Sequence, residues 1–221
     1  MCGRFTLTAE IDLLMDWFEI DEWTDIDLKP RFNIAPSQNI LAIVSNQRNR
    51  RAGLLKWGLI PPWAKDPSIG NKLINARAET AMEKPSFRNA IKRRRCLIPA
   101  SGFYEWKKEG KQKQPKYIQM KEDNLFAFAG LWERWSDDSG NPLHTCTILT
   151  TKPNELMEDI HNRMPVILPK DEYSRWLKSD EEPEAIEDLL QPYDAEKMAA
   201  HNVSTLVNSP RNELPECIEE M

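Results

Sequence analysis

Apolar positions along the chain predict one amphipathic helix near the start and many short strands after it. Ile11, Leu14, Met15 and Phe18 recur at helical spacing within residues 8–20, with Thr8 as the expected N-cap. Runs rich in β-branched and aromatic residues predict the strands, at 40–45, 54–57, 96–98, 103–106, 117–120, 125–131 and 145–150. Their number and shortness favour a mainly antiparallel sheet that curls on itself.

Polar stretches between these runs predict the remaining elements. Residues 107–116 hold Gly110 and five lysines between two strands, which indicates an exposed hairpin loop. Short helices are predicted at 154–159, 170–178 and 183–190, and a final strand at 202–207. The expected fold is α+β: a single domain over residues 1–221, with a mainly antiparallel curled β-sheet core and peripheral short helices. A chain of 221 residues with 40% hydrophobic content can bury one substantial core.

The net charge of −5 argues against a nucleic-acid partner, but the charges are sorted along the chain. Residues 29–121 hold 21 Lys and Arg against 5 Asp and Glu, whereas the rest holds 9 against 30. Because salt screens exposed charges beyond about 8 Å, a local basic surface can bind phosphates whatever the total charge. A solvated basic face without a ligand is the alternative.

Several function classes find no support in the sequence. No run of about 18 apolar residues could span a membrane, and no signal peptide is evident, so we expect a cytoplasmic or nucleoid-associated protein. The four cysteines and three histidines do not stand at metal-ligand spacing, so no metal or cofactor is predicted. Cys96 and Cys146 lie in apolar runs and are expected in the core.

Cys2 offers an unusual chemistry, because removal of Met1 would leave a cysteine with both a thiol and a free α-amine. The amine condenses with an aldehyde to a Schiff base, and the thiol can then close a five-membered thiazolidine ring on the same carbon. An internal cysteine lacks this amine. The alternative is that Cys2 merely follows the start of the chain.

An ordered set of motifs resembles the SOS response-associated peptidase (SRAP) family, whose members crosslink to abasic sites in single-stranded DNA. The motifs are MCGRF at 1–5, RFNIAP at 31–36, WGLIPPW at 57–63 running on to INARAET at 74–80, GFYEW at 102–106, and DIHNRMPV at 159–166. Together they span most of the chain, and their order makes them specific.

The resemblance implies a function and a set of site residues. It implies that Cys2 is the nucleophile and that Asn75, Glu105 and His161 are the polar active-site residues, and it allows the chain to remove its own Met1. It also implies that six residues lie near the DNA: Arg4, Asn33, Trp63, Arg77, Thr150 and Arg163. The expected partner is single-stranded DNA containing abasic sites, bound by a monomer without a cofactor.

The polar residues suit the chemistry of a sugar aldehyde. Strand alternation puts Phe103 and Glu105 on one face, where partial burial would raise the pKa of Glu105 and suit it to proton transfer. His161, on a loop after a short helix, could protonate the deoxyribose ring oxygen, and uncharged Asn75 could orient the amine or the sugar by hydrogen bonds. Arg77, two residues on, would suit a phosphate.

The sequence also allows purely structural roles for these residues, and it allows two other functions. Glu105 could be an edge-strand residue in water, His161 a structural histidine, and exposed Trp63 a packing residue and not a stacking platform for a base. One rival function is a cysteine peptidase or amidase that uses Cys2, His161 and Glu105 on an external peptide. Another is a non-covalent single-strand binding module.

Overall fold

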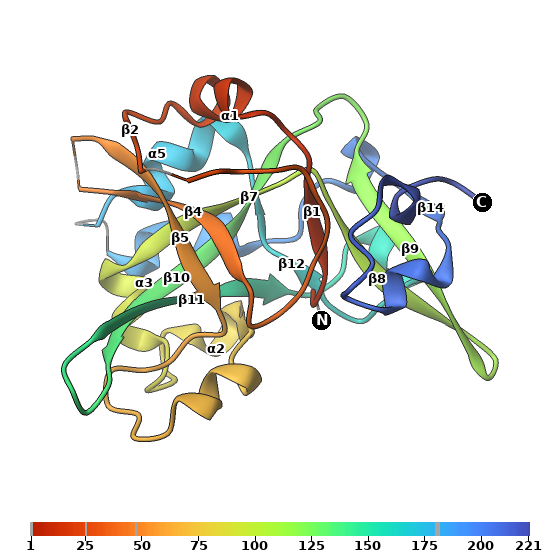
Figure 1. Cartoon of the computed structure of the whole chain (residues 1–221). Coiled ribbons are helices and arrows are strands. Elements are labelled where there is room, and N and C mark those ends of the chain that lie inside the picture. The colour runs from red at the N-terminus through yellow and green to blue at the C-terminus, as the bar shows by residue number, and fades with distance from the viewer. Residues whose placement is uncertain (1, 25, 47, 180–181) are drawn as a thin grey trace.

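Two β-sheets make up most of the computed structural model, which describes residues 2–24, 26–46, 48–179 and 182–221 (Figure 1). The smaller sheet holds, in spatial order, β14 (Met198–Asn202), β9 (Gln112–Met120), β8 (Gly102–Glu109), β1 (Phe5–Leu7) and β3 (Arg31–Ile34). Every neighbouring pair in this sheet is antiparallel. Met1, whose removal the sequence analysis predicts, lies outside the described residues.

The larger sheet curls round and closes on itself. Its order is β12 (Met164–Pro165), β11 (Pro142–Thr151), β10 (Phe126–Ser136), β7 (Arg95–Ala100), β4 (Asn39–Ser45), β5 (Arg50–Trp57) and β2 (Glu22–Trp23), with β6 (Asn75–Arg77) beside β11 and β13 (Ile167–Leu168) beside β10. β5 also pairs with β11 in parallel, which joins the two sides of the sheet. The predicted α+β fold, with a mainly antiparallel, curled sheet core and short helices, is confirmed.

Short helices lie around the sheets. They are α1 (Ile11–Phe18), α2 (Ala78–Ala81), α3 (Arg88–Arg93), α4 (Glu155–Glu158) and α5 (Tyr173–Leu177), with 3₁₀ helices η1 (Pro67–Lys72), η2 (Lys170–Glu172), η3 (Pro183–Leu190), η4 (Ala195–Lys197), η5 (Thr205–Asn208) and η6 (Pro215–Cys217). The amphipathic helix is confirmed, but its predicted cap is wrong. Glu10 is the N-cap residue, while the Thr8 N–H and hydroxyl donate to the Ser101 hydroxyl at 3.0 and 3.2 Å.

Two other predicted elements are also wrong. The stretch 107–116 is not a loop, because β8 and β9 pair to their ends and leave a tight turn at Gly110, whose φ is +62°. Its lysines project from an exposed hairpin, so composition misled the prediction. The final strand is β14, which ends at Asn202. The Ser204 hydroxyl accepts the Leu206 N–H and starts a 3₁₀ helix where a strand was expected.

β1 joins the smaller sheet to the core of the larger one. Phe5 packs edge-on against Trp57 and Phe128, with ring centroids 5.3 and 5.7 Å away. On β8, Phe103 faces this same core, whereas Tyr104 belongs to a second cluster under the C-terminal segment. The predicted alternation along β8 is therefore confirmed.

A close approach at Gly102 fixes β1 against β8. A Cβ at Gly102 would lie 2.3 Å from the Tyr117 ring, so only glycine fits there. The buried Thr6 hydroxyl lies 2.9 Å from the Tyr117 hydroxyl and donates to the Gly102 carbonyl oxygen at 3.3 Å. These contacts hold the start of the chain in register with β8.

Asn33 fastens the C-terminal segment to the smaller sheet. Its buried amide Nδ2 donates to the carbonyl oxygens of Val207, Ser209 and Asn212 at 3.3, 2.9 and 2.8 Å. Its Oδ1 accepts from the Arg4 guanidinium at 2.7 Å. Figure 1 shows the C-terminal segment, in blue, beside β8 and β9.

We predict that Asn33→Ala will lower the free energy of unfolding by about 1–3 kcal/mol, because it leaves buried carbonyl groups and Arg4 without their partner. Urea unfolding will measure the change, and amide exchange will be faster in residues 204–213. Asn39→Ala is the control, since Asn39 is an exposed strand residue. Equal stability of the two variants would contradict this role for Asn33.

Candidate active site

Cys2 lies where β1 begins, beside β8. The Tyr104 N–H donates to the Arg4 carbonyl oxygen at 3.0 Å, which continues the β1–β8 ladder towards the start of the chain. Cys2 is fully buried. Burial raises the pKa of its thiol well above the ordinary value, and the nearby Glu105 carboxylate raises it further. Burial therefore disfavours the thiolate form of Cys2.

Glu105 projects from β8 towards the same side as Phe103. Its side chain is only 3% exposed, although it carries a carboxyl group. Burial raises the pKa of Glu105, whereas the His161 imidazole lowers it. The β1–β8 pairing brings the residues before Phe5 alongside Glu105, and His161 is near enough to Glu105 to lower the pKa of its carboxyl group.

His161 stands on the loop that follows α4, as predicted from the sequence. Its Nδ1 accepts the backbone N–H of Arg163 at 3.1 Å and lies 3.2 Å from the Arg163 carbonyl oxygen. A neutral imidazole that accepts a hydrogen bond at Nδ1 carries its proton on Nε2. In either tautomer Nδ1 faces the Arg163 backbone, which leaves Nε2 as the ring nitrogen that can face a ligand.

Asn75 and Arg77 lie on β6, which runs parallel to β11. The Asn75 amide donates to the Ile148 carbonyl oxygen at 3.4 Å, a long hydrogen bond, while its buried Oδ1 has no partner among the described residues. A buried acceptor without a partner is costly, so this atom is suited to a donor on a ligand. Arg77 is exposed, on the same side of the strand by alternation, with Ala76 buried between them.

Arg4 and Asn33 form one unit at the base of β1. The Arg4 guanidinium donates to the Asn33 Oδ1 and to the Val207 carbonyl oxygen at 2.6 Å, and it lies 5.8 Å from the centre of the Trp106 ring. Partial burial lowers the pKa of Arg4 from its ordinary value. Asn33 itself is buried, so it supports Arg4 and does not present its own side chain to solvent.

Arg163 and Thr150 belong to a second group of contacts, which also includes Glu79. The Arg163 guanidinium makes a bidentate ion pair with Glu79, at 2.6 and 2.9 Å, and donates to the Thr150 carbonyl oxygen at 2.5 Å. Thr150 is buried and reaches Arg163 through its hydroxyl at 3.3 Å. The sequence analysis gave no role to Glu79, because no local pattern shows that it pairs with a residue 84 positions away.

Trp63 stands apart from these groups. It is 59% exposed in the loop between β5 and η1, as the sequence predicted. The loop is braced by the Trp135 indole N–H, which donates to the Ala64 carbonyl oxygen at 2.7 Å. The structure gives Trp63 an exposed ring on a fixed loop, but no contact links it to Cys2.

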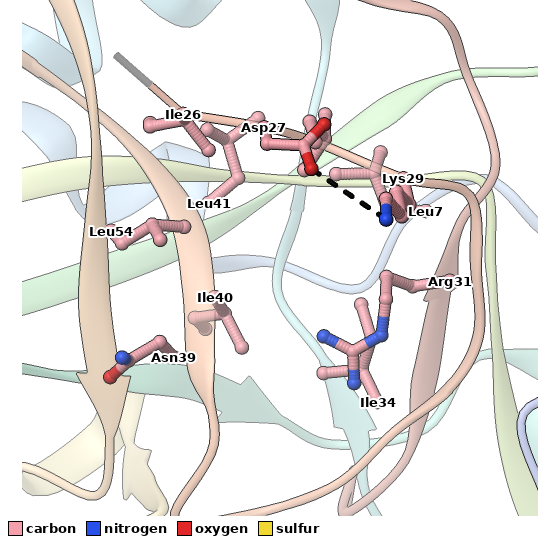
Figure 2. A pocket seen from close by; sticks show the side chains of 11 residues that line it. Leu7, Ile26, Asp27, Lys29, Arg31, Ile34, Asn39, Ile40, Leu41 and Leu54 are labelled. Carbon is pink, nitrogen blue, oxygen red and sulfur yellow. Dashed lines mark ion pairs between the residues drawn. The ribbon is translucent and has the colours of Figure 1, made fainter. Parts of the chain in front are cut away.

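A separate pocket of about 340 Å³ lies between β1, β3 and β4 (Figure 2). Its wall is apolar, with Leu7, Ile40 and Leu54 among its residues, and an exposed Asp27–Lys29 ion pair lies at its rim. None of the predicted site residues lines it. Its charged groups, Asp27 and Lys29, are exposed and paired with each other, so the candidate active site is the Cys2 region and not this pocket.

Metal-ligand clusters and membrane-spanning helices are both absent from the described ranges. No group of three or more His, Cys, Asp and Glu side chains there could hold a metal ion. No helix among the described residues has the length and apolar character needed to cross a membrane.

Comparisons with known proteins identify the family. The family model described as "SOS response associated peptidase (SRAP)" matches residues 1–210. The chain is 57% identical over 222 residues to the abasic site processing protein YoqW of Bacillus subtilis, covering 99% of each chain. It is 40% identical over 190 residues to the abasic site processing protein HMCES of Gallus gallus, covering 74% of this chain and 56% of that protein.

A solved structure agrees with this match. The crystal structure of a protein from Bacteroides thetaiotaomicron superposes with a TM-score of 0.91 at 32% identity, and the match covers 100% of both chains. The ordered motifs, the fold and the relatives point to the same conclusion. This chain belongs to the SOS response associated peptidase (SRAP) family.

Proposed function

We propose that the chain processes abasic sites in single-stranded DNA by trapping them covalently through Cys2. The observation that carries the proposal is the burial of Cys2 and Glu105 at the β1–β8 pairing, where an N-terminal aminothiol would stand beside a buried carboxyl group, with His161 near enough to affect that carboxyl group. The names of the relatives, abasic site processing proteins, support the same lesion as the substrate.

The reaction begins once Met1 is removed and the Cys2 α-amine is free. His161 gives a proton to the ring oxygen of the deoxyribose as the C1′–O4′ bond breaks, and the proton of the C1′ hydroxyl group returns to the imidazole, which leaves the open-chain aldehyde. The amine attacks C1′ to form a carbinolamine, and Glu105 takes a proton from the nitrogen and gives one to the hydroxyl group, which leaves as water. The product of these steps is a Schiff base between Cys2 and C1′.

The thiol then closes the ring. Because burial raises the pKa of the Cys2 thiol and disfavours the thiolate, the amine attacks first and the sulfur adds to the imine carbon afterwards. The thiol proton passes to the nitrogen as the C–S bond forms, so the whole sequence releases one water. The unpaired Oδ1 of Asn75 is suited to accept a hydrogen bond from the amine or from a sugar hydroxyl.

The rival functions keep a weaker basis. A peptidase acting on external peptides would need the same buried Cys2 to reach a peptide carbonyl, and the names of the relatives refer to abasic sites and not to peptides. A purely non-covalent binding module would not explain why the Glu105 carboxyl group is buried beside Cys2.

We predict that Cys2→Ser will lose stable crosslinking while it keeps non-covalent binding, because serine retains the amine but closes a weaker oxazolidine ring. The measurement uses uracil-containing single-stranded DNA, uracil glycosylase and a heated denaturing gel. Cys217→Ser, which changes another buried thiol, is the matched control. Durable crosslinks from Cys2→Ser would remove the thiazolidine from the mechanism.

We predict that the acid limb of the crosslinking rate will reflect Glu105 and will lie above the ordinary glutamate range, since burial raises the pKa of this group. The rate will fall as the pH drops through that value, because a neutral Glu105 cannot accept the amine proton. Glu105→Gln will remove this limb and slow the reaction at higher pH, by about 10²-fold or less given the reactive aldehyde. An unchanged limb in Glu105→Gln would assign it to another group.

We predict that Arg77→Ala will weaken binding to undamaged and damaged single strands alike, because phosphate contacts carry no sequence or lesion information. The slope of log affinity against log salt will flatten by about 0.7. Arg51→Ala, which removes an exposed arginine from β5, is the control. The same slope in wild type and Arg77→Ala would place Arg77 away from the DNA.

A further inference from the structure

The Glu79–Arg163 ion pair joins two parts of the active site that are far apart in the sequence. Glu79 lies on α2, directly after the strand of Asn75 and Arg77, while Arg163 lies two residues after His161. The pair is bidentate, at 2.6 and 2.9 Å, and the same guanidinium donates to the Thr150 carbonyl oxygen. Two parallel hydrogen bonds fix the orientation of a guanidinium as well as its distance.

The backbone of Arg163 passes this restraint on to His161. The Arg163 N–H donates to the His161 Nδ1 at 3.1 Å, so the imidazole rests on the same residue that Glu79 holds. The His161 N–H donates to the Met157 carbonyl oxygen at 2.8 Å, which fixes the other side of the loop to α4. Movement of Arg163 would therefore turn the His161 ring relative to Glu105.

The burial of Arg163 and the negative charge of Glu79 explain why the ion pair is needed to hold Arg163 in place. The Arg163 side chain is only 15% exposed, whereas Glu79 is 50% exposed. Arg163 lowers the pKa of Glu79, which keeps the carboxylate ionised, and no other carboxylate among the described residues forms an ion pair with Arg163. Without Glu79, this largely buried cation would keep only the oxygen atoms of Thr150 and would be drawn towards solvent.

We propose that Glu79 is a positioning residue for His161 and acts through Arg163. The ion pair sets the place of Arg163, and the Arg163 N–H then holds the imidazole with Nδ1 as acceptor and the Nε2 proton available for the ligand. This proposal rests on the proposed function for its kinetic consequence, but the restraint on the His161 ring exists with or without DNA.

The first test measures the tautomer of the His161 imidazole in the protein without DNA. Long-range ¹H–¹⁵N spectra of the imidazoles will be recorded for wild type, Glu79→Gln and Glu83→Gln, with His161 assigned from the peaks lost in His161→Gln. Glu83 is the matched control, because it is exposed, lies just after α2 and carries the same charge. We expect the Nε2–H tautomer in wild type and Glu83→Gln, and averaged nitrogen shifts in Glu79→Gln.

Wild-type nitrogen shifts in Glu79→Gln would overturn the proposal. This test needs no abasic DNA, so it holds even if the chain forms no crosslink. Failure of the crosslinking reaction in wild type would overturn the proposed function and leave the result for Glu79 intact.

The second test separates rate from binding. We expect Glu79→Gln to slow crosslinking at saturating DNA on the order of tenfold, since a misplaced general acid loses part of its effect. The DNA concentration for half-saturation will be measured in the same series, with Glu83→Gln as the control that also removes one negative charge, so that any change in DNA contact by Arg163 is kept apart from the change in rate. Glu79→Asp, which restores the charge on a shorter side chain, will recover part of the rate.

A double variant shows whether Glu79 acts through His161. In a His161→Ala background the change Glu79→Gln should add no further slowing, because there is no imidazole left to position. A full tenfold loss in that background would contradict the proposal, as would a Glu79→Gln rate equal to that of Glu83→Gln.

Discussion

The pairing of β1 with β8 is the constraint on which the rest of the site depends. Phe5 stands opposite Phe103 and Thr6 opposite Gly102, so the residues before Phe5 run alongside Tyr104 and Glu105. The glycine permits the Tyr117 ring to lie against the strand, and the Thr6 hydroxyl completes the contact. The first residues of a chain are otherwise among the most mobile parts of a protein. Here Cys2 is buried in the hydrophobic core, just before the strand that pairs with β8.

The pairing of β1 with β8 buries two ionisable groups, the Cys2 thiol and the Glu105 carboxyl group, and burial of their charged forms costs free energy. A buried thiol and a buried carboxyl group favour their neutral forms, and their mutual effect is repulsive when both are ionised. The cost is consistent with chemistry in which protons move between an amine, a carboxyl group and a thiol in sequence. The unpaired oxygen of Asn75 adds to the same picture, since a ligand donor would satisfy it.

Local patterns predicted much of this structure, and distant contacts account for the rest. The spacing of Ile11, Leu14 and Phe18 predicted α1, and alternation at 103–106 placed Glu105 on the face of the main core. Three contacts join residues that are far apart in the sequence, so no local pattern contains them. They are the pairing of β5 with β11, the hydrogen bonds from Asn33 to the C-terminal segment, and the Glu79–Arg163 ion pair. The polar run 107–116 was misjudged because an exposed hairpin needs few apolar residues to pair its backbone. The site residues came from the family resemblance, and their roles stay predictions.

The bond between Cys2 and the sugar is the central claim, and intact mass spectrometry of the crosslinked product tests it most directly. The account predicts a chain that begins at Cys2, a mass equal to protein plus abasic strand less one water, a Cys2 sulfur that no longer reacts with iodoacetamide, and no mass gain on borohydride treatment. An adduct on a chain that keeps Met1, or one that borohydride reduces while the thiol stays free for alkylation, would contradict the thiazolidine account.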